Sequence, residues 1–342
     1  MILVTGANGF IGSHVARLLV KEGRPVRCFL REGSNRVNLE GDEFKGRLEF
    51  AYGDLRDIDS VRKAAKGAKT VYHIAAYAHL WYPDPKIVYE INHGGSRNVF
   101  QACREEGVEK VVYTNTAAIL RGGTKQDPSG EEAVLTLDKM PGHYTRSKLL
   151  AYEEALKYAK DGLPLTIVSP TTPIGEGDCN LTPPGKMIVD FLNGRLPAYI
   201  DTVINYIDVE DAAAGHILAE KKGRIGERYI LGAFNLTLEE IFGILSKITG
   251  KPAPRLKLPA APLLPLGFLC EKISEWITHK EPPIPWEGLR LAKRPLAFDS
   301  SKAVRELGLP QGGIEAALRK AVGWFCEKGY VKNSNIKNQN PK

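Results

Sequence analysis

Two residues of the segment "HYTRSK", Tyr144 and Lys148, could together move a proton to or from a bound molecule. They stand four positions apart in a segment with helical periodicity, so both side chains are expected on one face of a helix. A phenol ordinarily ionises near pH ~10, and a neighbouring ammonium favours the phenolate and lowers that pKa. A second Tyr-x-x-x-Lys copy begins at Tyr82, but it encloses two prolines and cannot lie inside a regular helix. The pair predicts an acid–base group at Tyr144; the alternative is an exposed tyrosine beside a solvated lysine.

A hydroxyl that could polarise a carbonyl group follows an apolar run in "VVYTNTAAIL". Thr114, Asn115 and Thr116 all offer polar groups at this point. In an open parallel sheet, ligands bind at the carboxyl ends of the strands. We choose Thr116, because it lies beyond the strand and leads into small residues, although an ordinary β-branched strand end is the alternative.

Three glycines in "LVTGANGFIGSH", Gly6, Gly9 and Gly12, separate the first apolar run from a helical pattern. Glycine permits a tight turn and a close approach to a pyrophosphate, and a helix N-terminus presents free N–H groups to that anion. The GxxGxxG spacing is one residue longer than GxGxxG, and a plain glycine-rich turn is the alternative. The position directly after the first strand predicts a dinucleotide site, which should also include Asn8, Phe10 and Ile11.

The end of the second strand should choose between NAD and NADP. NAD sites usually carry an acidic residue there, whereas an arginine accommodates the 2′-phosphate of NADP. Here Arg31 follows the strand, no carboxylate precedes Glu32, and Ser34 lies in the same turn. The sequence favours NADP(H), with NAD as the alternative if Arg31 is only a solvated charge. Further expected cofactor contacts are Asp54, Leu55, Ala75, Ala76, Pro170 and Thr172, together with Tyr144 and Lys148.

The elements that position these residues alternate between strand and helix. Alternation of this kind predicts an α/β protein with a Rossmann-like, doubly wound parallel sheet. The expected strands are Ile2–Thr5, Val26–Leu30, Leu48–Tyr52, Thr70–Ile74, Lys110–Thr114 and Leu165–Ser169, and the expected helices between them are Ile11–Glu22, Ile58–Ala65, Ser96–Glu106 and His143–Lys160.

The pattern changes near residue 170, where prolines and glycines become frequent. We expect residues 1–170 to form an NAD(P)-binding domain, to which elements around 198–230 return. Residues 171–331 should form mainly a smaller, mixed α/β C-terminal lobe for the substrate. Helices are expected there at Val209–Lys221, Leu238–Ile248, Leu264–Ile277 and Ile314–Lys328, and the polar tail 332–342 is expected to be disordered.

Composition narrows the classes of function. The net charge is +7, but lysine and arginine are scattered, which argues against nucleic acid as a partner. The five cysteines are far apart and form no Cys/His cluster, so no metal site is expected. The chain opens on a core strand, and no apolar run reaches the ~18 residues of a membrane span, so we expect a cytoplasmic protein without a membrane span.

Together, "TGANGFIG", "GDL", Thr116, "YTRSK" and "NYIDVEDAAAGHI" resemble the extended short-chain dehydrogenase/reductase family. Through "LWYPDP", "INHGGSRN", "IVDFLNGRLPAYIDT" and "GRIGERYILGAFNLTLEEI", the chain is most similar to hopanoid-associated sugar epimerases. Through "VRCFLREGS" it resembles the dihydroflavonol-4-reductase-like branch. The resemblance implies a catalytic set of Thr116, Tyr144 and Lys148, a proton relay through Asn92, a C-terminal lobe that holds a small-molecule substrate, and a homodimer.

Two departures from the family patterns bear on the reaction. Sugar 4,6-dehydratases carry an Asp-Glu pair after the hydroxyl residue, and this chain has Ala117 and Ala118, which argues against dehydration. Many nucleotide-sugar enzymes carry Arg-Pro after the sixth strand, and this chain has Ser169-Pro170, which weakens the case for a nucleotide sugar.

Three functions remain open: an NADP(H)-dependent oxidoreductase acting at a secondary alcohol or ketone, an NAD(P)-dependent sugar epimerase, and a non-catalytic dinucleotide-sensing protein. The presence of Tyr144 argues against the third, and Arg31 favours the first. A set of bulky apolar residues would suit a partly apolar ketone or aldehyde, unless these residues belong to the core. The set comprises Tyr77, Leu80, Trp81, Tyr82, Ile119, Leu120, Met140, Phe191 and Trp286.

Overall fold

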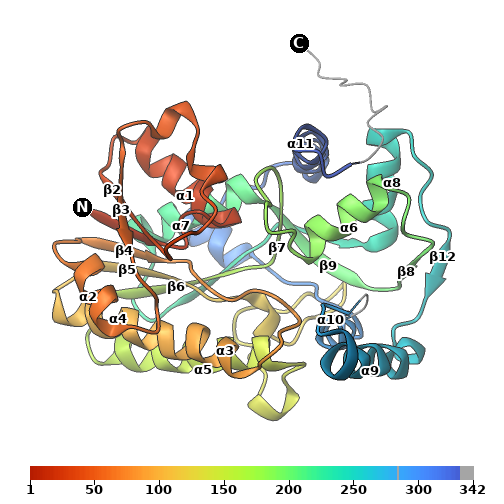
Figure 1. Cartoon of the computed structure of the whole chain (residues 1–342), viewed down its shortest axis with the longest axis horizontal. Helices are drawn as coiled ribbons and strands as arrows, with labels where there is room; N and C mark the ends of the chain where they lie inside the picture. The colour runs from red at the N-terminus through yellow and green to blue at the C-terminus, as the bar shows by residue number, and fades with distance from the viewer. Residues whose placement is uncertain (283–284, 332–342) are drawn as a thin grey trace.

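A computed structural model describes residues 1–282 and 285–331 of the chain. It contains a seven-stranded parallel sheet with helices on both faces, beside a lobe built on two smaller sheets (Figure 1). The fold is the Rossmann-like, doubly wound α/β architecture that the sequence predicts. The tail 332–342, for which we predicted disorder, lies outside the described residues.

The large sheet has the strand order β10-β6-β5-β4-β1-β2-β3. Its strands are β1 (Ile2–Thr5), β2 (Val26–Leu30), β3 (Leu48–Tyr52), β4 (Thr70–His73), β5 (Lys110–Thr114), β6 (Leu165–Pro170) and β10 (Arg228–Leu231). The six predicted strands are confirmed to within one residue. Ile2 pairs with Val26 on one side and with Thr70 on the other, so the order of the strands reverses at β1. Such a reversal opens a crevice at the carboxyl ends of β1 and β4, where ligands bind in open α/β sheets.

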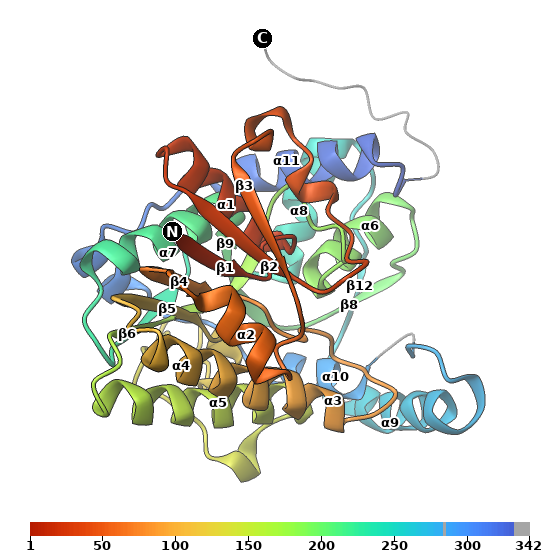
Figure 2. The same ribbon diagram turned by 60° about the vertical axis from the view of Figure 1, so that its left-hand side comes forward.

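Helices cover both faces of this sheet because the strands are apolar on both sides (Figure 2). Ile2 and Val4 face one core, and Leu3 faces the other. On the first face lie α1 (Phe10–Lys21) and α7 (Val209–Lys222); on the second lie α2 (Ile58–Ala65), α4 (Gly95–Glu105) and α5 (His143–Lys160).

One helix starts earlier than the sequence predicts. Helical structure precedes α4 in α3 (Lys86–Tyr89) and in the π-helical turn η3 (Glu90–Gly94). The two adjacent glycines obscured this extension, because glycine disfavours a helix interior. Gly95 is required where it stands: a Cβ atom there would lie 2.8 Å from the side chain of Leu55.

The smaller lobe has its own apolar core between its sheets and helices. One sheet has the order β11-β9-β7 and the other pairs β12 with β8. Their bounds are β7 (Thr172–Ile174), β8 (Ala198–Ile200), β9 (Val203–Asp208), β11 (Phe234–Thr237) and β12 (Leu256–Leu258). The helices of this half are α6 (Pro183–Leu192), α8 (Leu238–Thr249), α9 (Leu264–Ile273), η7 (Ser274–Thr278), α10 (Trp286–Ala292) and α11 (Ile314–Glu327).

Short helical turns complete the described chain. They are η1 (Val37–Leu39), η2 (Asp42–Phe44), η4 (Ala117–Ile119), η5 (Leu137–Lys139), η6 (Ala261–Leu263) and η8 (Ala303–Leu307). Among the described residues, we find no helix with both the length and the apolar character to cross a bilayer.

Candidate active site

The glycine turn between β1 and α1 is closely packed. Gly6 has φ +69°, in the left-handed region, and a Cβ atom there would lie 2.7 Å from the Cα of Ala75. A Cβ atom on Gly12 would collide with the carbonyl oxygen of Gly6. Gly9 is the N-cap of α1 and its N–H donates to the Gly6 carbonyl at 3.0 Å. The turn therefore brings the N-terminus of α1 to the crevice at the strand-order reversal.

The residues beside these glycines connect the turn to its neighbours. The Asn8 side chain donates to the carbonyl of Asn35 at 2.8 Å, which joins the turn to the loop after β2. The amide of Ala75 donates to the Thr5 hydroxyl at 3.2 Å. Phe10 is buried, Ile11 is partly buried and Ala76 is exposed.

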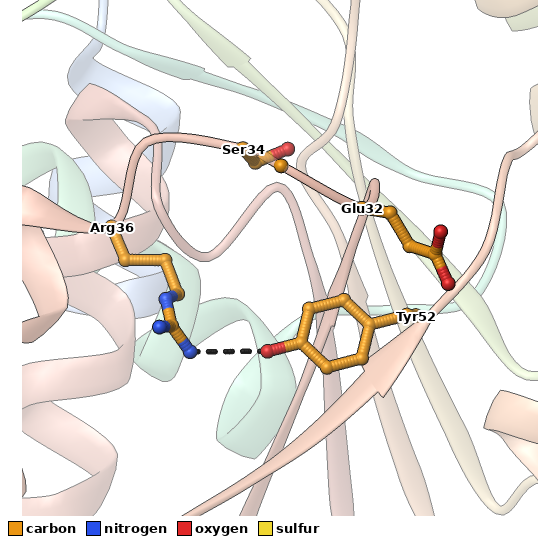
Figure 3. Close-up of a pocket in the computed structure, with 5 residues that line it drawn as sticks. Glu32, Ser34, Arg36 and Tyr52 are labelled. Carbon is orange, nitrogen blue, oxygen red and sulfur yellow. Dashed lines mark hydrogen bonds between the residues drawn. The ribbon is translucent and has the colours of Figure 1, made fainter.

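The loop after β2 and the end of β3 border an open hollow of about 330 Å³, lined by Glu32, Gly33, Ser34, Arg36 and Tyr52 (Figure 3). Arg36 donates to the Tyr52 hydroxyl at 3.0 Å and lies over the Phe50 ring. Sequence reasoning selected Arg31 and Ser34 and missed Arg36. Only the pairing of β2 with β3, which carries Tyr52, could have indicated it.

Arg31 is exposed and does not line this hollow. Its charge contributes to lowering the pKa of Asp54, after the larger effect of the hydrogen bonds that Asp54 accepts from Arg56. Arg56 forms a two-pronged contact with this carboxylate at 2.8 and 3.0 Å. Leu55 is buried against Gly95.

The carboxyl ends of β5 and β6 border the same crevice. Thr114 donates its hydroxyl to, or accepts from, His216 at 2.9 Å, and the Asn115 amide donates to the carbonyl of Lys148. Thr116 instead hydrogen-bonds the phenol of Tyr144. Of the three candidates in "TNT", Thr116 is thus the one that the fold joins to the tyrosine. Pro170 ends β6 and Thr172 begins β7 just beyond it.

Tyr144 and Lys148 lie in the first turns of α5, but their electrostatics differ from the expectation. Burial raises the pKa of Tyr144 to about 12, the Thr116 hydroxyl opposes this rise, and the charge of Glu287 adds to it. Burial lowers the pKa of Lys148 to about 7. The ammonium donates to the Thr114 carbonyl at 2.8 Å and lies 5.1 Å from the centre of the Tyr113 ring. The predicted lowering of the tyrosine pKa is therefore wrong for this structure, because burial raises this pKa and the group that opposes the rise is the Thr116 hydroxyl rather than Lys148.

Asn92, predicted to join a proton relay, is buried and connects a loop to α5. Its side-chain oxygen accepts from the Tyr77 amide at 2.7 Å, and its nitrogen donates to the Ser147 hydroxyl at 3.0 Å. These bonds hold the Tyr77 loop against the helix that carries Tyr144.

A carboxylate from the smaller lobe, Glu287 of α10, reaches the N-terminus of α5. It accepts hydrogen bonds from the amides of Tyr144 (3.3 Å) and Thr145 (3.2 Å) and from the Tyr82 hydroxyl (2.8 Å). The N-cap, Gly142, has no side chain to do this, and a Cβ atom there would collide with Glu287. Burial raises the pKa of Glu287. Nothing in the sequence indicated this contact, since about 140 residues separate the two helices.

With this geometry in place, comparison with known proteins identifies the family. The model of the NAD dependent epimerase/dehydratase family matches residues 2–232. This chain belongs to that family. It is accordingly an enzyme, an NAD(P)-dependent oxidoreductase or epimerase.

Relatives of this family member match along nearly its whole length. A protein of Synechocystis sp. named "Putative dihydroflavonol 4-reductase" is 39% identical over 96% of this chain and 95% of its own. "Sterol demethylase protein B" of Methylococcus capsulatus is 32% identical over 96% of this chain and 99% of its own. Among solved structures, gox2253 superposes with a TM-score of 0.85 at 38% identity, covering 97% of this chain and 99% of that one.

The predicted apolar set divides into two groups in this family member. Ile119, Leu120 and Met140 are fully buried in core clusters, and Phe191 packs against Phe242 inside the smaller lobe. For these four, the substrate-facing prediction is wrong, because the surrounding cores enclose them. The other five, Tyr77, Leu80, Trp81, Tyr82 and Trp286, are partly exposed and lie on α10 and on the loop that contacts it.

Proposed function

We propose that this enzyme is an NADP(H)-dependent oxidoreductase that interconverts a ketone and a secondary alcohol, with Tyr144 as the acid–base group. The observation that carries the proposal is the partly buried phenol, joined to the Thr116 hydroxyl and held with a pKa of about 12. Such a phenol keeps its proton at neutral pH and can donate it in a reduction.

The cofactor would lie along the carboxyl edge of the large sheet. The close packing at Gly6 and Gly12 brings the free N–H groups at the N-terminus of α1 to the crevice, which supports a pyrophosphate there, with Asn8, Gly9, Phe10 and Ile11 around it. Asp54, Leu55, Ala75 and Ala76 would follow the adenosine half, and Lys148, Tyr144, Pro170 and Thr172 the nicotinamide half. Residues 1–170 with the returning elements would thus bind the dinucleotide, and residues 171–331 mainly the substrate.

Each side chain of the site then has one task. The cofactor, when bound, would supply a hydride to the carbonyl carbon, and Tyr144 would donate the proton to the carbonyl oxygen. Thr116 orients that oxygen and the phenol. Lys148, charged below its pKa of about 7, would donate to the ribose while its contact with Thr114 keeps it in place. Asn92 holds the Tyr77 loop against α5.

The preference for NADP(H) rests on the loop after β2. Arg36 and Ser34 line the hollow there, and the exposed Arg31 begins the same loop. A guanidinium suits the 2′-phosphate because it donates charge-assisted hydrogen bonds to it. Glu32 lines the same hollow and would hold the ribose hydroxyls if NAD were the cofactor. Arg36→Asp should therefore raise the KM for NADPH at least ~10-fold and change the KM for NADH less. Arg31→Asp should act in the same direction. If neither variant changes the preference between NADPH and NADH, this hollow does not select the cofactor.

The names of the relatives support a partly apolar substrate. A dihydroflavonol and a sterol are both ring systems with a secondary alcohol or ketone, and the aromatic residues of the 77–82 loop and α10 would suit them. The second candidate is a sugar epimerase, which the family name itself includes. The homodimer expected from the resemblance stays a prediction.

Net cofactor consumption separates the two candidates. We would incubate the enzyme with NADPH and a panel of ring ketones, aldehydes and nucleotide sugars, and follow absorbance of the reduced cofactor together with product chromatography. The proposal expects one NADPH oxidised for each ketone reduced. Isomerisation of a sugar with an unchanged cofactor balance would reject it in favour of the epimerase.

A further inference from the structure

The helical segment formed by α9 and η7 carries a row of apolar side chains that face solvent. Eleven large apolar side chains are exposed among the described residues, and six of them lie within the 12 residues from Leu266 to Ile277. Trp276 and Ile277 are the most exposed of all, at 74% and 72%. We call the row formed by Leu266, Phe268, Leu269, Ile273, Trp276 and Ile277 the apolar stripe.

The stripe lies on a helix whose other face is already packed. Phe268 borders that packed face, because its ring lies edge-on to the ring of Trp286 of α10, with the ring centres 5.7 Å apart. Gly267 faces α10 so closely that a Cβ atom there would collide with Leu289, and Ser274 is buried. The Glu271 carboxylate accepts the N–H of Trp286 at 2.8 Å. Figure 2 shows α9 projecting from the body of the molecule beside α10. The apolar stripe is therefore not unfilled core, and none of the described residues covers it.

Size argues against a second copy of the chain as the cover. A helix of 12 residues is about 18 Å long and ~10 Å wide. Stable protein contacts bury roughly 800 Å² on each partner, several times this footprint. A shallow apolar medium is better matched to a single row of side chains, and tryptophan concentrates where such a medium meets water.

Charge indicates which medium. Residues 264–294, which include α9, η7 and α10, contain five lysines and arginines against four glutamates. Two of these glutamates are already engaged, because Glu287 is buried at α5 and Glu271 accepts the Trp286 N–H, while Glu275 pairs with Lys272. Within the stripe, the Lys272 ammonium lies 5.6 Å from the centre of the Phe268 ring and 5.8 Å from that of Trp276. An apolar row with a cationic surround is the pattern of helices that lie in the interface of an anionic bilayer.

We propose that the apolar stripe docks this enzyme on the surface of an anionic lipid bilayer. Residues such as Trp276 and Ile277 would enter the headgroup region, and the flanking cations would meet lipid phosphates. Docking would place α10 near the bilayer, and with it Glu287 and the N-terminus of the helix that carries Tyr144. The proposal does not depend on which reaction the site performs.

Vesicle sedimentation with the full chain tests it. Wild type should co-sediment with phosphatidylglycerol vesicles, less with phosphatidylcholine vesicles, and less at high salt. A Leu269→Ser/Trp276→Ser/Ile277→Ser variant should bind at least tenfold more weakly, without loss of circular dichroism signal, because the three side chains are exposed. Leu137→Ser/Ile225→Ser is the matched control, since these two side chains are 46% and 56% exposed on other elements, and should bind as wild type does.

Two outcomes would overturn the proposal. One is equal sedimentation of wild type and the triple variant, or no sedimentation of either. The other is a triple variant that changes oligomeric state in size-exclusion chromatography while wild type ignores vesicles, which would assign the stripe to contacts between copies of the chain.

Discussion

At the scale of single residues, the proton of Tyr144 is the quantity on which the proposed chemistry turns. The pKa of about 12 keeps the phenol protonated across the neutral range. We expect Tyr144→Phe to lower kcat at least ~100-fold, the usual contribution of a positioned acid, while NADPH affinity changes less than about twofold. Turnover and fluorescence titration of NADPH check the two halves. Turnover at the wild-type rate would reject Tyr144 as the acid.

Thr116 provides a control at the same scale. Its hydroxyl is the polar group that the structure joins to the phenol. Thr116→Ser keeps this hydroxyl and should retain most of the turnover. Thr116→Ala removes the hydroxyl, so it should lose most of the turnover and the pKa of Tyr144 should rise further. Equal activities of the two variants would show that the hydroxyl has no part in the reaction.

At the scale of elements, α10 of the smaller lobe completes the N-terminus of α5. Glu287 supplies the acceptors that Gly142 lacks, and its charge raises the pKa of Tyr144. Glu287→Gln removes the charge and keeps an acceptor, so the pKa of the phenol should fall. Since alcohol oxidation needs the phenolate, the pH at half-maximal oxidation should move to a lower value.

The matched control for this prediction is Glu271→Gln. Glu271 lies in the same lobe, and burial raises its pKa as well, but its hydrogen bond goes to Trp286 rather than to α5. We expect no shift of the oxidation profile in this variant. A shift of the same size in both variants would mean that the loss of any buried carboxylate in the smaller lobe shifts the profile, and that the contact of Glu287 with α5 is not the cause.

The turn between β1 and α1 leads to a second prediction about elements. Gly12→Ala would force a Cβ atom against the Gly6 carbonyl and should lower the melting temperature and weaken NADPH binding. Gly323→Ala lies in helix α11 with open space around the new methyl group and should raise stability by roughly 0.5–1 kcal/mol. Calorimetry of the pair separates crowding from helix propensity. Equal stability changes would contradict the close packing of the turn.

How far the sequence could predict this enzyme also depends on scale. Periodicity located the six strands, because apolar side chains must alternate or run together to bury both faces of the sheet. Local motifs brought Thr116, Tyr144 and the glycine turn into view. Arg36 and Glu287 stayed hidden, since each acts through a partner that only the folded chain brings close. The pKa of Tyr144 was misjudged for a related reason: burial is a property of the whole fold.

At the scale of the whole molecule, the site costs stability that a pH titration can measure. Burial holds the pKa of Lys148 at about 7 in the folded chain, below its ordinary 10.5. Between these two values the unfolded chain binds a proton that the folded chain does not, so stability rises with pH across this window and is lowest below pH 7. One pKa unit corresponds to about 1.4 kcal/mol, so the total effect should reach a few kcal/mol.

Lys148→Met isolates this effect between pH 7 and 10.5. The variant also changes the pKa of His73, which burial and then the charge of Lys148 lower to about 3, but that titration lies far below this window. We compare the free energy of unfolding of the variant with that of wild type at each pH. The difference, variant minus wild type, should increase as the pH falls from 10.5 to 7 and then stay constant at lower pH. Denaturant unfolding of both proteins, without cofactor, at a series of pH values measures it. A difference in stability that is constant with pH would mean that Lys148 keeps an ordinary pKa. Water would then have to reach the Lys148 ammonium beside the Thr114 carbonyl and the Tyr113 ring, where the structure has it buried.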